Sequence, residues 1–352
     1  MSRTGRTFSR RTFLAAAAGA AATAARWGRA KGVAAAGPVA TRGAVVMPSD
    51  VTTWPWVERA AKAGLTTLAL HGPPHELAVF AKSEPGQAFL RDCAANTIAV
   101  EYECHAANQL LPRELFQKDA TLFRMNEAGE RTADANLCVS SPRALEIACE
   151  NAVRLAAEIP PSTGRYYFWS DDAQPMCRCP KCNGLSDSDQ TLVLENAILK
   201  TLRKGHPDAT LAHLCYNRTL SAPGQVKPEP GIFLEYAPIE RDSTKPLGDA
   251  SIAEHVKLMD YLSANLAVFG AETAQVLEYW LDVSRFSKWK RESLTQMPWS
   301  EEMYRDDLRT YAKLGIRHFT TFACWIDGEY VKRFGEPPLG EYGQGLLSLS
   351  KA

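Results

Sequence analysis

Beyond residue 40, the 352-residue chain has no internal repeat, no low-complexity segment and no long apolar run. A helix that spans a bilayer takes roughly 20 consecutive apolar residues. The nearest approach to such a run is the alanine-rich part of "SRRTFLAAAAGAAATAA" near the N-terminus, which is shorter and only weakly hydrophobic. The sequence therefore predicts no membrane span in the mature protein.

Acidic residues are absent from residues 1–36, a segment typical of a twin-arginine signal peptide. The paired Arg10 and Arg11 precede the alanine-rich run, and small residues suited to cleavage follow in "GVAAAG". We expect export by the twin-arginine route to the periplasm or the extracellular space. When the seven basic residues of this segment are left out, the chain has 33 basic and 40 acidic residues, which gives a net charge of −7. This acidic balance predicts no nucleic-acid partner.

Short apolar runs alternate with longer amphipathic ones from residue 41 onward, which predicts an α/β fold. The short runs are rich in β-branched and aromatic residues and are bounded by Gly, Pro, Asp or Asn, as strands are. The predicted strands are residues 44–48, 66–72, 97–106, 165–172, 210–216, 231–238, 275–282 and 318–327.

Eight strands alternating with helices predict a (β/α)8 TIM barrel, here a single domain over residues 41–345. The helical patterns are clearest at residues 54–64, 141–159, 189–205, 249–266 and 300–315. The proline-rich connection between the fifth and sixth strands should lack a full helix, and residues 107–140 form an insertion after the third strand. A doubly wound sheet is the alternative, but no glycine-rich phosphate loop follows the first strand.

Carboxylates and aromatic side chains recur where the predicted strands end, which is where the functional groups of a TIM barrel gather. Carboxylates can do acid–base work and bind hydroxyls, while Trp and Tyr faces can stack on sugar rings. This composition predicts a carbohydrate substrate. The strand-end candidates are His71, Glu101, Glu103, His105, Asp171, Asp172, Tyr216, Asn217, Glu235, Glu278, Trp280, Asp282, Trp325, Asp327 and Glu329.

A metal-dependent hydrolase is a second interpretation of such a barrel. That class usually has a His-x-His pair on the first strand, and the predicted first strand has none. His71 and His105 would then have to supply the ligands. The ordinary alternative is that both histidines form hydrogen bonds at a loop.

Three of the nine cysteines cluster in "CRCPKC", just beyond the fourth predicted strand. These three are Cys177, Cys179 and Cys182. Their spacing lets the thiolates share one zinc ion, but a structural zinc site takes four ligands. The candidates for the fourth ligand are Cys138, Cys104 and Cys215. The alternatives are a disulfide to Cys138 or free thiols. A zinc ion or a disulfide would hold the loop after Asp172 in a structural role. Catalysis is expected to need no cofactor.

Three stretches, "YECHAANQLLP", "LCVSSPRALE" and "WSDDAQPMCRCPKC", share an order and spacing with a bacterial family. Because of these three stretches, residues 97–245 resemble the family catalogued as domain of unknown function 4838. One departure is that Asp171, Asp172 and Ala173 stand where the family usually has Asn-Asp-Gly. The family is similar to barrel glycoside hydrolases such as alpha-glucuronidases and hexosaminidases, so the resemblance implies a barrel and a glycan substrate.

We therefore expect an exported glycoside hydrolase that cleaves a uronic-acid or amino-sugar glycan with paired carboxylates. Asp172 is the expected acid or base, because the neighbouring Asp171 would raise one pKa of the pair. Glu278 is the expected second carboxylate, with Glu235 as its competitor. The expected substrate-binding residues are Glu103, His105, His71, Tyr216, Asn217, Trp280, Trp325 and Asp327. A barrel that binds glycans without catalysis is the remaining alternative, and the sequence leaves the oligomeric state open.

Overall fold

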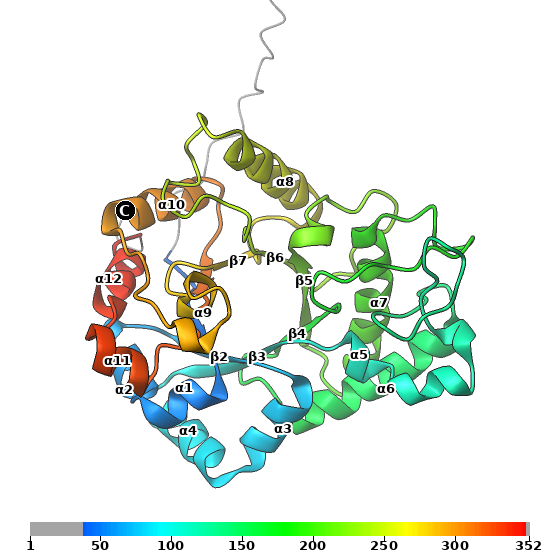
Figure 1. The fold of residues 1–352 in the computed structure, drawn as a ribbon, viewed down its shortest axis with the longest axis horizontal. Coiled ribbons are helices and arrows are strands. Elements are labelled where there is room, and N and C mark those ends of the chain that lie inside the picture. Colours follow the sequence, from blue (N-terminus) through cyan, green and yellow to red (C-terminus); the bar gives the residue numbers. More distant parts are fainter. Residues whose placement is uncertain (1–37, 350–352) are drawn as a thin grey trace, which may run out of the picture. The chain divides into compact units, whose positions relative to one another are not determined.

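The computed structural model describes residues 38–349, in which eight parallel strands form a closed barrel (Figure 1). Each strand pairs with the next in chain order, and β1 pairs with β8 through Thr41 and His318 to close the ring. The strands are β1 (Thr41–Val46), β2 (Thr67–His71), β3 (Ala99–His105), β4 (Arg165–Trp169), β5 (Thr210–Cys215), β6 (Ile232–Tyr236), β7 (Gln275–Glu278) and β8 (His318–Thr321). The predicted (β/α)8 barrel is confirmed.

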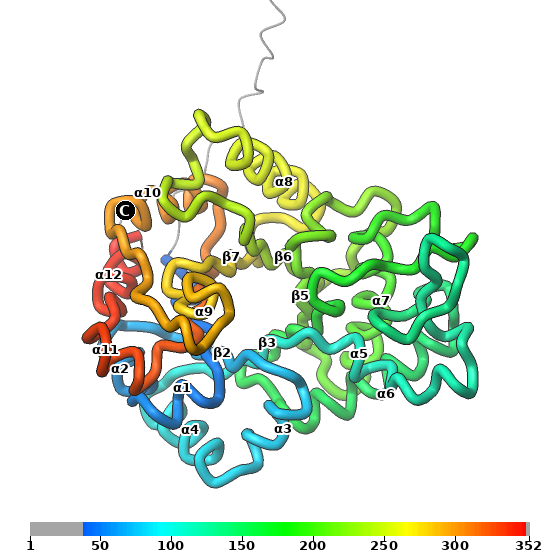
Figure 2. The backbone as a smooth tube through the Cα atoms, in the orientation of Figure 1, coloured from blue at the N-terminus to red at the C-terminus, as the bar shows by residue number. Residues whose placement is uncertain are grey.

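The longer helices surround the ring of strands, and the tube in Figure 2 follows the chain from strand to helix and back. The α-helices are α1 (Pro48–Thr53), α2 (Trp56–Ala63), α3 (Pro74–Lys82), α4 (Glu84–Ala95), α5 (Ala107–Leu110), α6 (Pro142–Glu158), α7 (Asp187–Leu202), α8 (Ala253–Phe269), α9 (Val283–Phe286), α10 (Glu301–Lys313), α11 (Gly328–Phe334) and α12 (Leu339–Leu349). The 3-10 helices are η1 (Arg113–Gln117), η2 (Ala120–Leu122), η3 (Asn217–Thr219) and η4 (Arg291–Ser293).

Local sequence signals set the ends of several helices. Ser186 caps α7 by accepting a hydrogen bond from the Asp189 amide, while the Asp189 carboxylate accepts from the Ser186 amide. Ser300 caps α10 in the same position through the Met303 amide. Helix α2 ends at Gly64, whose φ of 78° lies in the left-handed region that glycine tolerates.

Side chains along each strand alternate between the interior of the barrel and the layer beneath the helices, as strand geometry requires. Leu277 of β7 belongs to the inner apolar cluster, together with Val45 and Ala69. Its neighbour Val276 belongs to the outer cluster, which also contains Leu68. The strands are therefore apolar on both faces, as the near-continuous hydrophobic runs in the sequence indicate.

Polar side chains also cross the interior of the barrel through one chain of hydrogen bonds. The guanidinium of Arg165 donates to the Gln275 side-chain oxygen at 3.0 Å, and the Gln275 amide nitrogen donates to Glu235 at 3.0 Å. The Trp169 indole donates to the other Glu235 oxygen at 2.8 Å. The carboxylate of Glu101 lies 3.8 Å from Arg165 Nε. This network ties β3, β4, β6 and β7 together from the inside.

The connections agree with expectation in part. The segment between β5 and β6 carries the short η3 instead of a full helix, and the insertion after β3 holds α5, η1 and η2. Helices α3 and α4 were not predicted. The C-terminal residues form α12, which packs against α2 and α10 (Figure 1). The expected signal peptide at residues 1–36 lies outside the described residues, and in the described part no helix is both long and apolar enough to cross a bilayer.

We predict that Gly343→Ala lowers the free energy of unfolding by about 1–3 kcal/mol, because a Cβ there would lie 1.8 Å from the Ala63 carbonyl oxygen. Urea denaturation measures the loss. Gly340→Ala in the same helix is the matched control, since its Cβ meets nothing within 4 Å. That change should be neutral or add about 0.5–1 kcal/mol, because alanine favours a helix over glycine. Equal effects of the two changes would contradict the close packing of α12 on α2.

Candidate active site

A cavity of about 260 Å³ opens where the strands end. Its walls come from the last residues of the strands and from the loops that follow them, so it lies at the face where TIM barrels carry their active sites. The lining residues are Met47, His71, His105, Trp169, Asp172, Leu214, Tyr216, Ala237, Ile239, Leu277, Tyr279, Asp282, Ser284, Trp289, Phe322, Cys324 and Trp325. Five expected site residues meet here: His71, His105, Asp172, Tyr216 and Trp325.

Aromatic rings form much of the cavity wall. The rings of Tyr279 and Phe322 stack with their centroids 5.3 Å apart. Trp169 is held by its hydrogen bond to Glu235, and Trp289 leaves 63% of its surface exposed at the cavity. Trp289 was not among the expected site residues, because it follows α9 and not a predicted strand. Such flat apolar faces suit a ring-shaped ligand that is polar at its edges.

Asp172 presents its carboxylate to the cavity. Its side chain is 62% exposed and lies 3.8 Å from His105 Nε2, and burial, helped by the nearby Asp172, raises the pKa of Tyr216. The adjacent Asp171 has a different position, because it is buried and accepts hydrogen bonds from the backbone amides of Asn108 and Asn136. The structure therefore places Asp172 in the cavity and Asp171 in the contact between the end of β4 and the insertion after β3.

Asp282 is the second carboxyl group of the cavity wall among the described residues. It caps α9 by accepting from the amide and the hydroxyl of Ser284. Burial raises the pKa of Asp282 to about 6, against the lowering effect of these hydrogen bonds. The sequence signal was present, since Asp282 ends the predicted strand 275–282, but Glu278 was preferred to it.

The two histidines of the cavity are oriented by backbone carbonyls. His71 Nδ1 lies 2.9 Å from the Glu103 carbonyl oxygen, and His105 Nδ1 lies 2.6 Å from that of Ser170. Burial, helped by the nearby His105, lowers the pKa of His71 to about 4, so this ring is neutral at pH 7. Among the described residues, His71 and His105 belong to no group of three or more candidate metal ligands. This geometry gives no support to the metal-dependent interpretation.

Two further expected acids lie inside the barrel and do not line the cavity. Glu103 is completely buried, and its carboxyl oxygens have no hydrogen-bond partner among the described residues. Burial, with Glu235 and Glu101 nearby, raises the pKa of Glu103 well above its usual value. Burial also raises the pKa of Glu235 to about 8, against the hydrogen bond from Trp169. Glu235 therefore does not line the cavity itself. It affects the cavity wall only through its hydrogen bond to Trp169, whose ring it orients.

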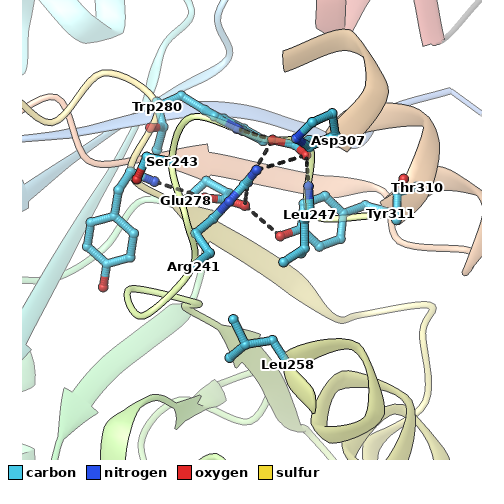
Figure 3. A network of polar contacts seen from close by, with 12 residues as sticks. Arg241, Ser243, Leu247, Leu258, Glu278, Trp280, Asp307, Thr310 and Tyr311 are labelled. Atoms are coloured by element: carbon cyan, nitrogen blue, oxygen red, sulfur yellow. Dashed lines mark hydrogen bonds and ion pairs between the residues drawn. The ribbon is translucent and has the colours of Figure 1, made fainter. Parts of the chain in front are cut away.

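Glu278 and Trp280 lie on the opposite face of the chain from Leu277 and Tyr279, beneath the helices (Figure 3). Glu278 accepts hydrogen bonds from Arg241 at 2.7 Å and from the Tyr311 hydroxyl at 2.6 Å. Trp280 donates to Asp307, which is also paired with Arg241. The structure thus places both residues in a buried ionic network and away from the cavity.

Asn217 and Asp327 also lie outside the cavity wall. Asn217 is exposed in η3 with a φ of 49°, a left-handed conformation that asparagine adopts more readily than most residues. Asp327 caps α11 through the Tyr330 amide and pairs with Arg291. The structure therefore brings neither residue to the cavity wall.

The three cysteines of the "CRCPKC" segment meet a fourth, Cys138 from the insertion. Their sulfur atoms all lie within 4.8 Å of one another, and all four side chains are buried. Cys104 and Cys215, the other candidates for the fourth position, are not in this group.

These features define a parallel eight-stranded α/β barrel with a carboxyl-lined cavity at the mouth that TIM barrels use for function. The profile of the family described as Domain of unknown function (DUF4838) matches residues 79–318, more than half of the chain. The chain therefore belongs to that family, as its motifs predict. No curated protein matches the chain in sequence.

Solved structures are similar to the chain at low sequence identity. A β-N-acetylhexosaminidase from Bacteroides fragilis NCTC 9343 is 10% identical with a TM-score of 0.50 over 87% of this chain; the match spans 65% of that protein, slightly less than two thirds. A GH5-4 broad specificity endoglucanase from an uncultured bacterium is 11% identical, with a TM-score of 0.48 over 85% of this chain and 86% of the other. At such identities the likeness concerns the fold alone.

We predict that Glu278→Gln lowers the free energy of unfolding by on the order of 3 kcal/mol, because it removes one charge from the buried pair with Arg241. Chemical denaturation at pH 7 measures the change. Glu272→Gln, at an exposed position shortly before β7, is the control and should stay within about 0.5 kcal/mol of the parent. A Glu278→Gln protein as stable as the control would show that the network contributes little to folding.

Proposed function

We propose that this protein is a glycoside hydrolase that acts at the mouth cavity, with Asp282 as the general acid and Asp172 as its partner carboxylate. The observation that carries the proposal is the pairing of two carboxyl groups with opposed environments in one aromatic-walled cavity. Asp172 is exposed, whereas Asp282 is buried with a pKa of about 6. Glycosidases need such a division of labour, since one group must hold a proton while the other is ionised.

The proton on Asp282 would pass to the oxygen of the leaving sugar as the glycosidic bond breaks. As that bond breaks, the anomeric carbon would bond either to water activated by Asp172 as the base or to the Asp172 carboxylate itself. In the second case water would then hydrolyse the ester, with Asp282 as the base that takes up its proton. Asp172 is suited to either role, because its side chain is 62% exposed and open to the ligand or to water. The aromatic wall supplies faces on which the pyranose rings would stack.

The charges at the cavity favour an amino-sugar glycan over a uronic-acid glycan. Within the described part of the chain, the residues that line the cavity include no arginine or lysine that could pair with a sugar carboxylate. His71 is neutral at pH 7, and Asp172 contributes negative charge to the wall. The preference rests on these charges, because the likeness to the hexosaminidase extends to the fold alone.

We also propose that the enzyme works outside the cytoplasm. The support is the twin-arginine pattern within residues 1–36, where Arg10 and Arg11 precede an alanine-rich run. Proteins on that route cross the membrane already folded. The barrel and its cavity would therefore form before export.

We predict that Asp172→Asn and Asp282→Asn each lower kcat on an amino-sugar oligosaccharide by about 10²-fold or more. The leaving group separates their roles. The leaving group of a 4-nitrophenyl glycoside is a stable phenolate, which needs no proton from the enzyme. Asp282→Asn should therefore lose far less activity on such a glycoside of an amino sugar. Asp172→Asn should lose activity on both substrates. Asp208→Asn, at an exposed site remote from the cavity lining, should retain full activity on both.

The pH dependence gives a second readout of the same variants. Because Asp282 must be protonated to act, kcat/KM of the parent should fall as the pH rises through about 6. Asp282→Asn should abolish that limb of the profile. Sugar binding without turnover by the parent would instead identify a non-catalytic glycan-binding barrel, and full oligosaccharide turnover by both variants would contradict the assigned roles.

A further inference from the structure

Four buried cysteines join two segments that are far apart in the sequence. Cys138 comes from the end of the insertion between β3 and α6, while the other three come from the loop between β4 and α7. In the described chain this is the one set of three or more His, Cys, Asp or Glu side chains arranged so that a single ion could touch them all. We propose that the four cysteines form a structural zinc site.

The spacing of the sulfur atoms fits a tetrahedral zinc ion. A zinc–sulfur bond is about 2.3 Å long, so two thiolates at tetrahedral positions lie about 3.8 Å apart. Cys138 Sγ lies 3.8 Å from that of Cys179 and 3.9 Å from that of Cys182. A disulfide would need about 2.05 Å. All four cysteines are free of disulfides, which leaves each sulfur available as a ligand.

The groups around the sulfur atoms are hydrogen-bond donors, as ligating thiolates require. The Met125 amide points at Cys177 Sγ at 3.3 Å, and the guanidinium of Arg131 lies 3.8 Å from the same atom. The Ser140 hydroxyl lies 3.1 Å from Cys138 Sγ. Four thiolates and Zn²⁺ carry a net charge of −2, which the positive charge of Arg131 would partly offset.

The chemistry of the ligand set indicates a structural and not a catalytic zinc ion. Catalytic zinc keeps one coordination position open for water or substrate, whereas four protein ligands fill a tetrahedral site. All four cysteines are buried, and none of them lines the mouth cavity. The zinc proposal therefore stands whether or not the cavity hydrolyses glycans.

The site would hold the insertion against the end of β4. Gln190 of α7 binds the Cys177 backbone on both sides, accepting from its amide and donating to its carbonyl. Asn136, two residues before Cys138, exchanges hydrogen bonds with Asp171. The ion would thus hold the end of the insertion beside the loop that follows Asp172.

The test is the metal content of the full chain, purified without added metal and dialysed against EDTA, by inductively coupled plasma mass spectrometry. We expect about one zinc per chain in the parent. Cys149→Ser is the matched control, since Cys149 is buried in α6 outside the cluster, and it should keep its zinc. Cys138→Ser should lose at least nine tenths of it.

Cobalt substitution keeps the proposal testable should Cys138→Ser fail to fold. Cobalt exchanged into the parent should show the strong visible and near-ultraviolet absorption of a tetrahedral tetrathiolate site. Any of three results would overturn the proposal: a parent without metal, iron in place of zinc, or a disulfide at Cys138 detected by mass spectrometry of the parent.

Discussion

Inside the closed barrel the guanidinium of Arg165 acts on three buried carboxyl groups. The polarity of the cavity depends on how the negative charge of these carboxyl groups is neutralised. Arg165 lies near Glu101, and its charge also acts on Glu103 and Glu235. One cation does not balance three buried carboxylates, and the desolvation of a buried charge is costly. Burial accordingly raises the pKa of all three carboxyl groups, which favours their uncharged form.

The buried polar network also fixes part of the cavity wall above it. Glu235 anchors the indole nitrogen of Trp169 and thereby fixes the orientation of an aromatic ring in the cavity wall. The two acids of the cavity wall differ in their own surroundings, because Asp282 is buried at the start of α9 while Asp172 extends into solvent. The barrel thus gives two aspartates different environments, one buried with a raised pKa and one exposed to solvent.

The barrel was predictable because parallel strands covered on both faces leave continuous apolar runs in the sequence. The choice between Glu278 and Asp282 was not, since the two residues would share a face of the predicted strand 275–282, whereas β7 ends at Glu278 and Asp282 lies beyond the strand as the cap of α9. Leu277 and Tyr279 point inward, so Glu278 points to Arg241 beneath the helices. Helices α3 and α4 escaped prediction because Ser83 ends one and caps the next, which breaks the amphipathic pattern.

The cysteine cluster shows a different limit. Three of its members are neighbours in sequence, and local spacing alone indicated a shared ligand. The fourth depends on the path of the irregular insertion after β3, which no periodic pattern encodes, so Cys138 could be named only as one candidate among three. The same holds for Trp289, whose place in the cavity wall follows from the loop after α9.

The most direct test of the central claim is a crystal structure of the slow Asp172→Asn variant soaked with an amino-sugar oligosaccharide. The account predicts that sugar rings lie in the mouth cavity against Trp169 and the exposed Trp289. The glycosidic oxygen should lie within about 3 Å of the Asp282 carboxyl. Sugar bound elsewhere on the barrel, or in the cavity with Asp282 facing no glycosidic oxygen, would contradict it.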